Sequence, residues 1–205
     1  FDQAGLLKAV DPVRGLGVVG LDGETHWLFP EQIIIPHPVH LLDLQDWREL
    51  CVELGEKQAE AVGDYLVRTH KPDIVISSPL IRAHNTARAI AARFDMPISF
   101  DEELMELNFG AYEGMSVEQI SEVNPEFVAT FGDVDHDRHW PEGERLSEFH
   151  ERVMGAFTRI ASIYNNHTVV VVSHGGVLGS WSAQLMGTHP NDWTRFQIQN
   201  CSVTH

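Results

Sequence analysis

Apolar runs alternate along this chain with segments in which apolar residues recur every three or four positions. The clearest run is Val169–Ser173, which begins with four consecutive valines and predicts a strand. A strand without a polar face must be covered on both sides, which is typical of a central strand in a parallel sheet. Shorter buried strands are predicted at 32–35, 73–77 and 97–100.

Helical periodicity separates these strands. The spacing of apolar residues predicts helices at 55–68, 81–94, 117–122, 147–165 and 177–186. Alternating strands and helices predict an α/β fold, a three-layer α/β/α sandwich with a mainly parallel central sheet, over residues 31–205. Residues 1–30 differ, because they contain short strands joined by turns, and the Asp22-Gly23 pair favours a hairpin. We therefore expect a short N-terminal β-hairpin appendage before the main domain.

Charge and composition narrow the possible partners. The 205 residues carry a formal net charge of −16, which disfavours contact with nucleic acid or an anionic membrane. No apolar run reaches membrane-spanning length, so no membrane partner is expected. Two cysteines without metal-ligand spacing indicate a cytoplasmic protein with no disulfide scaffold. An anionic substrate would require positive charge to be concentrated in one pocket.

The first candidate site is Ser173-His174-Gly175-Gly176, directly after the valine strand. Ligands bind at the carboxyl ends of strands in open α/β sheets, so His174 stands where chemistry is expected. The two glycines allow a backbone or an anion to approach closely. The alternative is a strand-end turn in which the histidine caps the next helix.

A second strand end leads through Ser77-Ser78-Pro79 to Arg82. Pro79 suits a first helical turn with Ser78 as the N-cap, which places Arg82 in the first or second turn. A cation is unfavourable near that end of the helix dipole unless an anion lies between it and the helix amides. The alternative is an arginine that pairs with a surface carboxylate.

Glu106 is the third candidate, flanked by apolar residues in a glycine-containing loop. Burial of this loop would raise the pKa of the carboxyl and make it a general acid near neutral pH. The alternative is an exposed loop carboxylate without a catalytic role.

Taken in order, four motifs resemble the histidine phosphatase superfamily, the phosphoglycerate-mutase-like phosphatases. They are Ser-Ser-Pro-Leu-x-Arg-Ala-x-x-Thr-Ala (77–87), Leu-x-Glu-x-x-x-Gly (104–110), Tyr-Glu-Gly (112–114) and Ser-His-Gly-Gly (173–176). The resemblance implies a phosphoglycerate-mutase-like fold. It also implies phosphomonoester hydrolysis through a phosphohistidine, without metal or other cofactor. The ligand would be a phosphorylated small molecule or inorganic phosphate, and similarity to the short general phosphatases favours phosphatase over mutase.

The resemblance also assigns roles to individual residues. It makes Arg82 a phosphate clamp, Glu106 the proton donor and His174 the second histidine of the pocket. Gly175 and Asn200 would lie in the phosphate pocket, and 200–204 resembles a strand that closes the pocket floor.

The nucleophile is where this chain departs from the family, because the Arg-His-Gly motif is absent. Pro36-His37-Pro38 follows a predicted strand and keeps a histidine, so we favour His37 as nucleophile. The second possibility is Leu21-Asp22-Gly23, in which Asp22 would form an aspartyl phosphate. Because this motif is altered, a catalytically inactive pseudophosphatase that keeps an anion pocket is the alternative to an active enzyme.

One further cluster, Asp135–His139, has the residue types of a metal site. It lies where the family carries a variable helical insertion over the pocket, and we interpret it as a solvated lid segment. Trp140 is expected to pack over the pocket, and Cys51 and Cys201 are expected to be core residues.

Overall fold

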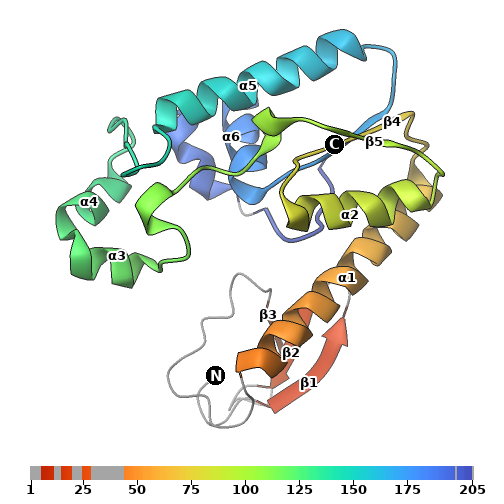
Figure 1. The fold of residues 1–205 in the computed structure, drawn as a ribbon, viewed down its shortest axis with the longest axis horizontal. Coiled ribbons are helices and arrows are strands. Elements are labelled where there is room, and N and C mark those ends of the chain that lie inside the picture. Colours follow the sequence, from red (N-terminus) through yellow and green to blue (C-terminus); the bar gives the residue numbers. More distant parts are fainter. Residues whose placement is uncertain (1–5, 12–14, 20–24, 29–43, 197, 205) are drawn as a thin grey trace.

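Strands in the described part of the chain form two separate sheets (Figure 1). The computed structural model describes residues 6–11, 15–19, 25–28, 44–196 and 198–204. The first sheet is antiparallel, in the order β1 (Leu6–Asp11), β2 (Gly15–Val19), β3 (Thr25–Leu28). The second is parallel, in the order β5 (Ile98–Phe100), β4 (Ile74–Ser77), β6 (Val169–Val172).

Six α-helices lie among the described residues, and along the chain they alternate with the parallel strands as predicted. They are α1 (Leu44–Thr69), α2 (Ile81–Ala92), α3 (Val117–Val123), α4 (Pro125–Ala129), α5 (Leu146–Ile163) and α6 (Gly175–Leu185). Four 3₁₀ helices complete the list, namely η2 (Glu102–Leu104), η3 (Gly110–Tyr112), η4 (Thr130–Gly132) and η5 (Pro190–Arg195). The longest, α1, begins eleven residues before the predicted start at 55. The prediction was too short because the apolar periodicity weakens before residue 55, although no proline or glycine interrupts the helix there.

The valines of β6 point alternately into two cores, one on each face of the parallel sheet. Val169 and Val171 pack against the core formed mainly by α5 and α6. Val170 and Val172 pack against the core formed by α1 and α2. This two-sided cover is the reason for four valines without a polar position, and it confirms the predicted α/β/α layers. Among the described strands the middle one is β4, while β6 pairs on one side only.

Two local predictions were wrong. The helix after β4 begins at Ile81, as its periodicity predicted, but its N-cap is Leu80, with extended dihedral angles, and not Ser78. Proline holds φ near −65° but does not enforce a helical ψ, so the chain makes a turn before the helix starts. The segment 200–204 forms a turn rather than a strand, with Ser202 N–H donating to the Gln199 carbonyl at 3.1 Å. The predicted strand at 32–35 lies outside the described residues.

Strand register brings the catalytic candidates to one edge of the parallel sheet. Ser77 lies opposite Val172 on one side and Phe100 on the other, so all three strands end together. The Ser78 N–H continues the ladder by donating to the Val172 carbonyl at 2.9 Å. The segments that carry the candidates therefore leave the sheet from the same edge.

Candidate active site

His174 is the N-cap residue of α6 and is buried, with 6% of its surface exposed. Its Nε2 lies 2.8 Å from the hydroxyl oxygen of Ser78, at the end of the neighbouring strand. Burial lowers the pKa of His174 to about 4, and the positive charges of Arg82 and Arg152 act in the same direction. The imidazole is therefore neutral near pH 7, with Nε2 committed to Ser78 and no described partner for Nδ1.

Glu106 lies in the loop between η2 and η3, where its carboxylate accepts two backbone hydrogen bonds. One comes from Leu107 N–H at 3.0 Å and the other from Gly176 N–H at 3.1 Å. Burial raises the pKa of Glu106, and these hydrogen bonds and the charges of Arg82 and Arg152 oppose that rise. The Glu106 side chain is half-buried rather than exposed, so the condition for a raised pKa is met.

The two glycines after His174 are not equivalent. A Cβ at Gly176 would lie 2.4 Å from Oε1 of Glu106, so the carboxylate occupies the space of a missing side chain. A Cβ at Gly175 would meet only the Ile198 carbonyl at 3.8 Å. Only at Gly176 does a side chain, the Glu106 carboxylate, come so close to the backbone that glycine is required. This contact places the carboxylate at the amino end of α6.

Arg82 lies in the first turn of α2 with an exposed side chain. Its charge lowers the pKa of both Glu106 and His174, so it acts on both groups at this edge. The described residues provide no ion-pair partner for its guanidinium. A cation at the amino end of a helix is unfavourable without an anion, and this arrangement suits an anionic ligand.

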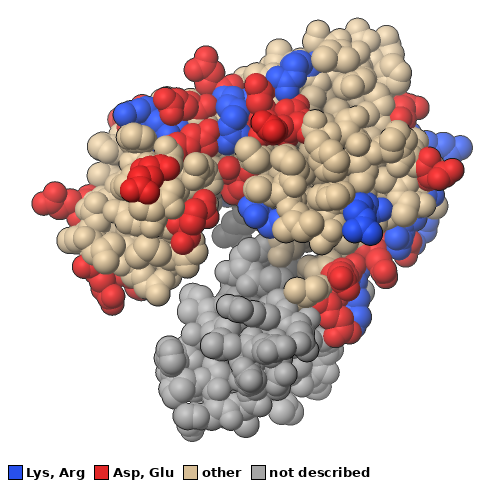
Figure 2. All heavy atoms as spheres, in the orientation of Figure 1, with Lys and Arg blue, Asp and Glu red and all other residues tan. Residues whose placement is uncertain are grey.

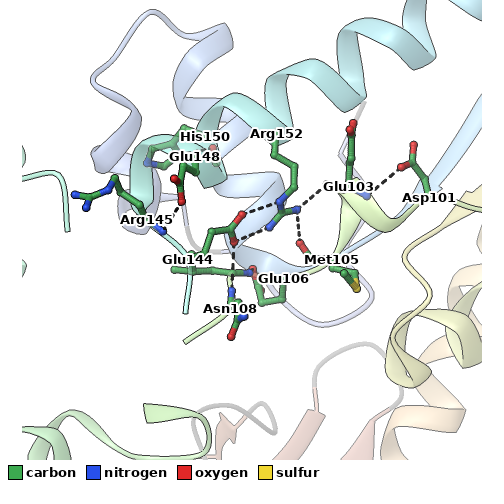
Figure 3. Close-up of polar contacts among 12 residues, drawn as sticks. Asp101, Glu103, Met105, Glu106, Asn108, Glu144, Arg145, Glu148, His150 and Arg152 are labelled. Carbon is green, nitrogen blue, oxygen red and sulfur yellow. Dashed lines mark hydrogen bonds and ion pairs between the residues drawn. The ribbon is translucent and has the colours of Figure 1, made fainter. Parts of the chain in front are cut away.

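Sequence reasoning missed Arg152, a residue of α5 that contacts the Glu106 loop (Figure 3). Its Nη1 donates to the carbonyls of Glu103 at 2.7 Å and Met105 at 2.9 Å. Its Nε and Nη2 donate to the two carboxylate oxygens of Glu144, both at 2.8 Å. An arginine on an amphipathic helix resembles any surface residue in the sequence, and only the fold brings these acceptors to it.

These residues fit the result of a comparison with known families. The model of the histidine phosphatase superfamily (branch 1) matches residues 51–205. The chain belongs to this superfamily. The matched region begins after both segments considered for the Arg-His-Gly motif.

Curated relatives of this histidine phosphatase include phosphatases and mutase-like proteins. Phosphoserine phosphatase 1 of Hydrogenobacter thermophilus is 31% identical over 152 residues, which cover 74% of this chain and 72% of that protein. Phosphoglycerate mutase-like protein 4 of Arabidopsis thaliana is 32% identical over 165 residues, covering 80% and 67%. The predicted superfamily and a phosphatase- or mutase-like function are thereby confirmed.

Solved structures agree with this assignment and with the predicted fold. A mycobacterial glucosyl-3-phosphoglycerate phosphatase in complex with VO3 has a TM-score of 0.63 and 25% identity, covering 73% of this chain and 75% of that one. The alpha-ribazole phosphatase of Shigella flexneri has the same TM-score and identity, covering 71% and 72%. The phosphoglycerate-mutase-like fold is therefore confirmed.

The segment 135–139 is held by protein contacts on Arg138, which is not solvated, while its other residues are exposed. Arg138 is buried, and its guanidinium donates to the hydroxyl and carbonyl oxygens of Thr130 at 3.1 and 2.9 Å. Trp140 is also buried and packs edge-on against Phe109, with ring centroids 4.7 Å apart. No three His, Cys, Asp or Glu side chains of the described residues are grouped as a metal site.

The remaining predicted site residues have different outcomes. Asn200 lies in a turn, and no hydrogen bond in the described structure joins it to His174, Glu106 or Arg82. Cys201, which follows it, packs against the α1–α2 core, as expected of a core residue. His37 and Asp22 lie outside the described residues, so the identity of the nucleophile stays a prediction. No helix of the described chain is both long and apolar enough to cross a membrane.

Proposed function

We propose that this histidine phosphatase hydrolyses phosphomonoesters of small molecules through a covalent phosphohistidine, without a metal or other cofactor. The observation that carries the proposal is one sheet edge where a neutral histidine, a carboxyl with a raised pKa and an arginine act together. These are His174, Glu106 and Arg82, which come from three separate segments of the chain.

Each group has a role that follows from its chemistry. Arg82 stabilises the charge that develops on the phosphoryl oxygens, which is the main requirement in phosphoryl transfer. Neutral His174 donates a hydrogen bond to one of these oxygens, and Gly175 and Asn200 are further proposed phosphate-pocket residues. Glu106 is suited to proton transfer because burial favours its protonated form.

The reaction takes place in two steps. The nucleophile, for which we propose His37, attacks phosphorus while the bond to the leaving oxygen breaks and Glu106 gives that oxygen its proton. The Glu106 carboxylate then takes a proton from water, which attacks phosphorus and breaks the phosphorus–nitrogen bond. Phosphate leaves and the starting protonation states return.

Charge distribution supports a small substrate with few negative groups. No lysine or arginine occurs between residues 94 and 137, and acidic side chains are spread over α3 and α4 (Figure 2). An extended polyanion would be repelled by this surface, whereas a single phosphoryl group can be held at Arg82.

Trapping the intermediate tests both the reaction and the nucleophile. The protein is mixed with a ³²P-labelled aryl phosphate in EDTA and quenched in alkali or in acid. A phosphohistidine survives alkali and is cleaved by acid, whereas an aspartyl phosphate is cleaved by alkali. We expect an alkali-stable label in wild type and Asp22→Asn, and none in His37→Ala.

Two outcomes would overturn the proposal. An alkali-labile label that disappears in Asp22→Asn would assign the chemistry to Asp22. No label and no turnover, with phosphate still raising the melting temperature of the wild type but not of Arg82→Ala, would identify a pseudophosphatase that keeps its anion pocket.

The proposal also covers localisation, partners and domain organisation. We place the enzyme in the cytoplasm on its cysteine content, and expect neither nucleic acid nor membrane as partner because of its charge. Residues 1–30 are proposed as an appendage to the catalytic domain of residues 31–205.

A further inference from the structure

Arg152 makes hydrogen bonds with four of its five N–H groups, all to protein acceptors (Figure 3). Two go to main-chain carbonyls, those of Glu103 and Met105. The other two form a bidentate pair with Glu144, in which the side chains are 21% and 16% exposed. A guanidinium with four N–H groups already hydrogen-bonded to the protein is not available to hold a phosphoryl group.

The acceptors of Arg152 lie on both sides of Glu106 along the chain. Glu103 and Met105 precede it, and Glu144 contacts the residue that follows Leu107. The Glu144 N–H donates to the Asn108 carbonyl at 2.9 Å, and the Asn108 N–H donates to the Glu144 carboxylate at 3.4 Å. The loop that carries Glu106 is thus fastened at both ends to α5 and to the segment before it.

We propose that Arg152 is a positioning residue that, with Glu144, fixes the loop so that the Glu106 carboxyl faces the reacting phosphoryl group. This inference rests on the proposed role of Glu106 as proton donor. Only a planar guanidinium can reach two carbonyls and both oxygens of a carboxylate together, because a lysine ammonium offers three donors from one point. Its loss would leave two loop carbonyls and a carboxylate without their partner.

The charge of Arg152 adds a second effect that the experiment can detect. It is one of the groups that lower the pKa of Glu106 against the larger effect of burial. A neutral residue at this position would raise the pKa of Glu106. Since Glu106 acts in its protonated form, the alkaline limb of the rate profile would move to higher pH.

The test compares two substrates that differ in their need for a proton donor. Glycerol 2-phosphate has a basic leaving oxygen and needs protonation, whereas 2,4-dinitrophenyl phosphate has a leaving group that departs without it. For Arg152→Met and Arg152→Lys we expect kcat/KM with glycerol 2-phosphate to fall on the order of 100-fold, as for a displaced catalytic group. The loss with the dinitrophenyl ester should be under about threefold, since no proton transfer is required.

The ratio of the two kcat/KM values is the decisive quantity, because any loss of folded protein lowers both equally. The matched control is Arg159→Met, two turns further along α5. Arg159 pairs with the side chains of Asp101 and Glu103 but with no loop carbonyl in the described structure. Its variant should keep the wild-type ratio and the wild-type alkaline limb.

A fourth variant separates the inference from the proposed function. Glu106→Gln should lower the ratio at least as much as Arg152→Met. If it does, and both Arg152 variants keep the wild-type ratio and pH profile, Arg152 is a structural residue and the inference is wrong. If Glu106→Gln itself leaves the ratio unchanged, Glu106 is not the proton donor, and the proposed function fails at that residue.

Discussion

Replacing Gly176 by alanine tests the contact that brings Glu106 to the amino end of α6. The added Cβ would lie 2.4 Å from Oε1 of Glu106, whereas ordinary contacts begin at 3.4 Å. The carboxyl must therefore move by about 1 Å, and the bond from Gly176 N–H to Oε2 is lost or lengthened. A displacement of about 1 Å at a catalytic group lowers the rate on the order of 100-fold.

Stability should change much less than activity in this variant. Alanine gains about 1 kcal/mol over glycine in a helix. Loss of a hydrogen bond to a charged group costs about 1.5–3 kcal/mol. These effects oppose each other, so unfolding in urea should change by no more than about 2 kcal/mol while kcat/KM with glycerol 2-phosphate falls.

The control is Gly155→Ala in α5, where an added Cβ meets nothing within 4 Å. It should keep wild-type kcat/KM and gain stability from helix propensity alone. Wild-type activity in Gly176→Ala, or an equal loss in Gly155→Ala, would refute the argument that Glu106 needs the space at Gly176.

Three further predictions follow from buried polar groups. Because the folded pKa of His174 is about 4, below the 6.5 of the unfolded chain, protonation favours unfolding, and stability is lost as pH falls from about 6.5 to 4. In His174→Gln this loss should shrink by up to about 3 kcal/mol in urea titrations, and an unchanged pH slope would contradict the lowered pKa. Both amide atoms of Gln58 are buried without a described partner, so Gln58→Met should raise the free energy of unfolding by about 1–2 kcal/mol; a decrease would mean that the amide is bonded in solution. Asn191 joins buried His150 to the carbonyl of Val134, at 2.9 and 2.6 Å, and Asn191→Ala should speed proteolysis at 133–137 while cleavage elsewhere stays constant.

Local patterns in the sequence determined which segments of this protein form strands and which side chains are covered. The four valines of β6 require apolar cover on both faces, and the structure provides it from α5–α6 on one side and α1–α2 on the other. The apolar neighbours of Glu106 suggested that burial could raise its pKa, and partial burial does so. Such features follow from hydrophobic periodicity and propensity, which act over a few residues.

Other features were decided only by the tertiary structure, because they join residues far apart in the chain. The bond between His174 and Ser78 depends on the parallel register of β4 and β6. The need for glycine at 176 depends on the Glu106 carboxylate, seventy residues earlier. Arg152 looks like an ordinary charged position of an amphipathic helix, and its contacts appear only when folding brings two carbonyls and Glu144 to its guanidinium. Sequence patterns encode which side chains are buried, but the partners of a polar side chain are set by the distances that packing creates.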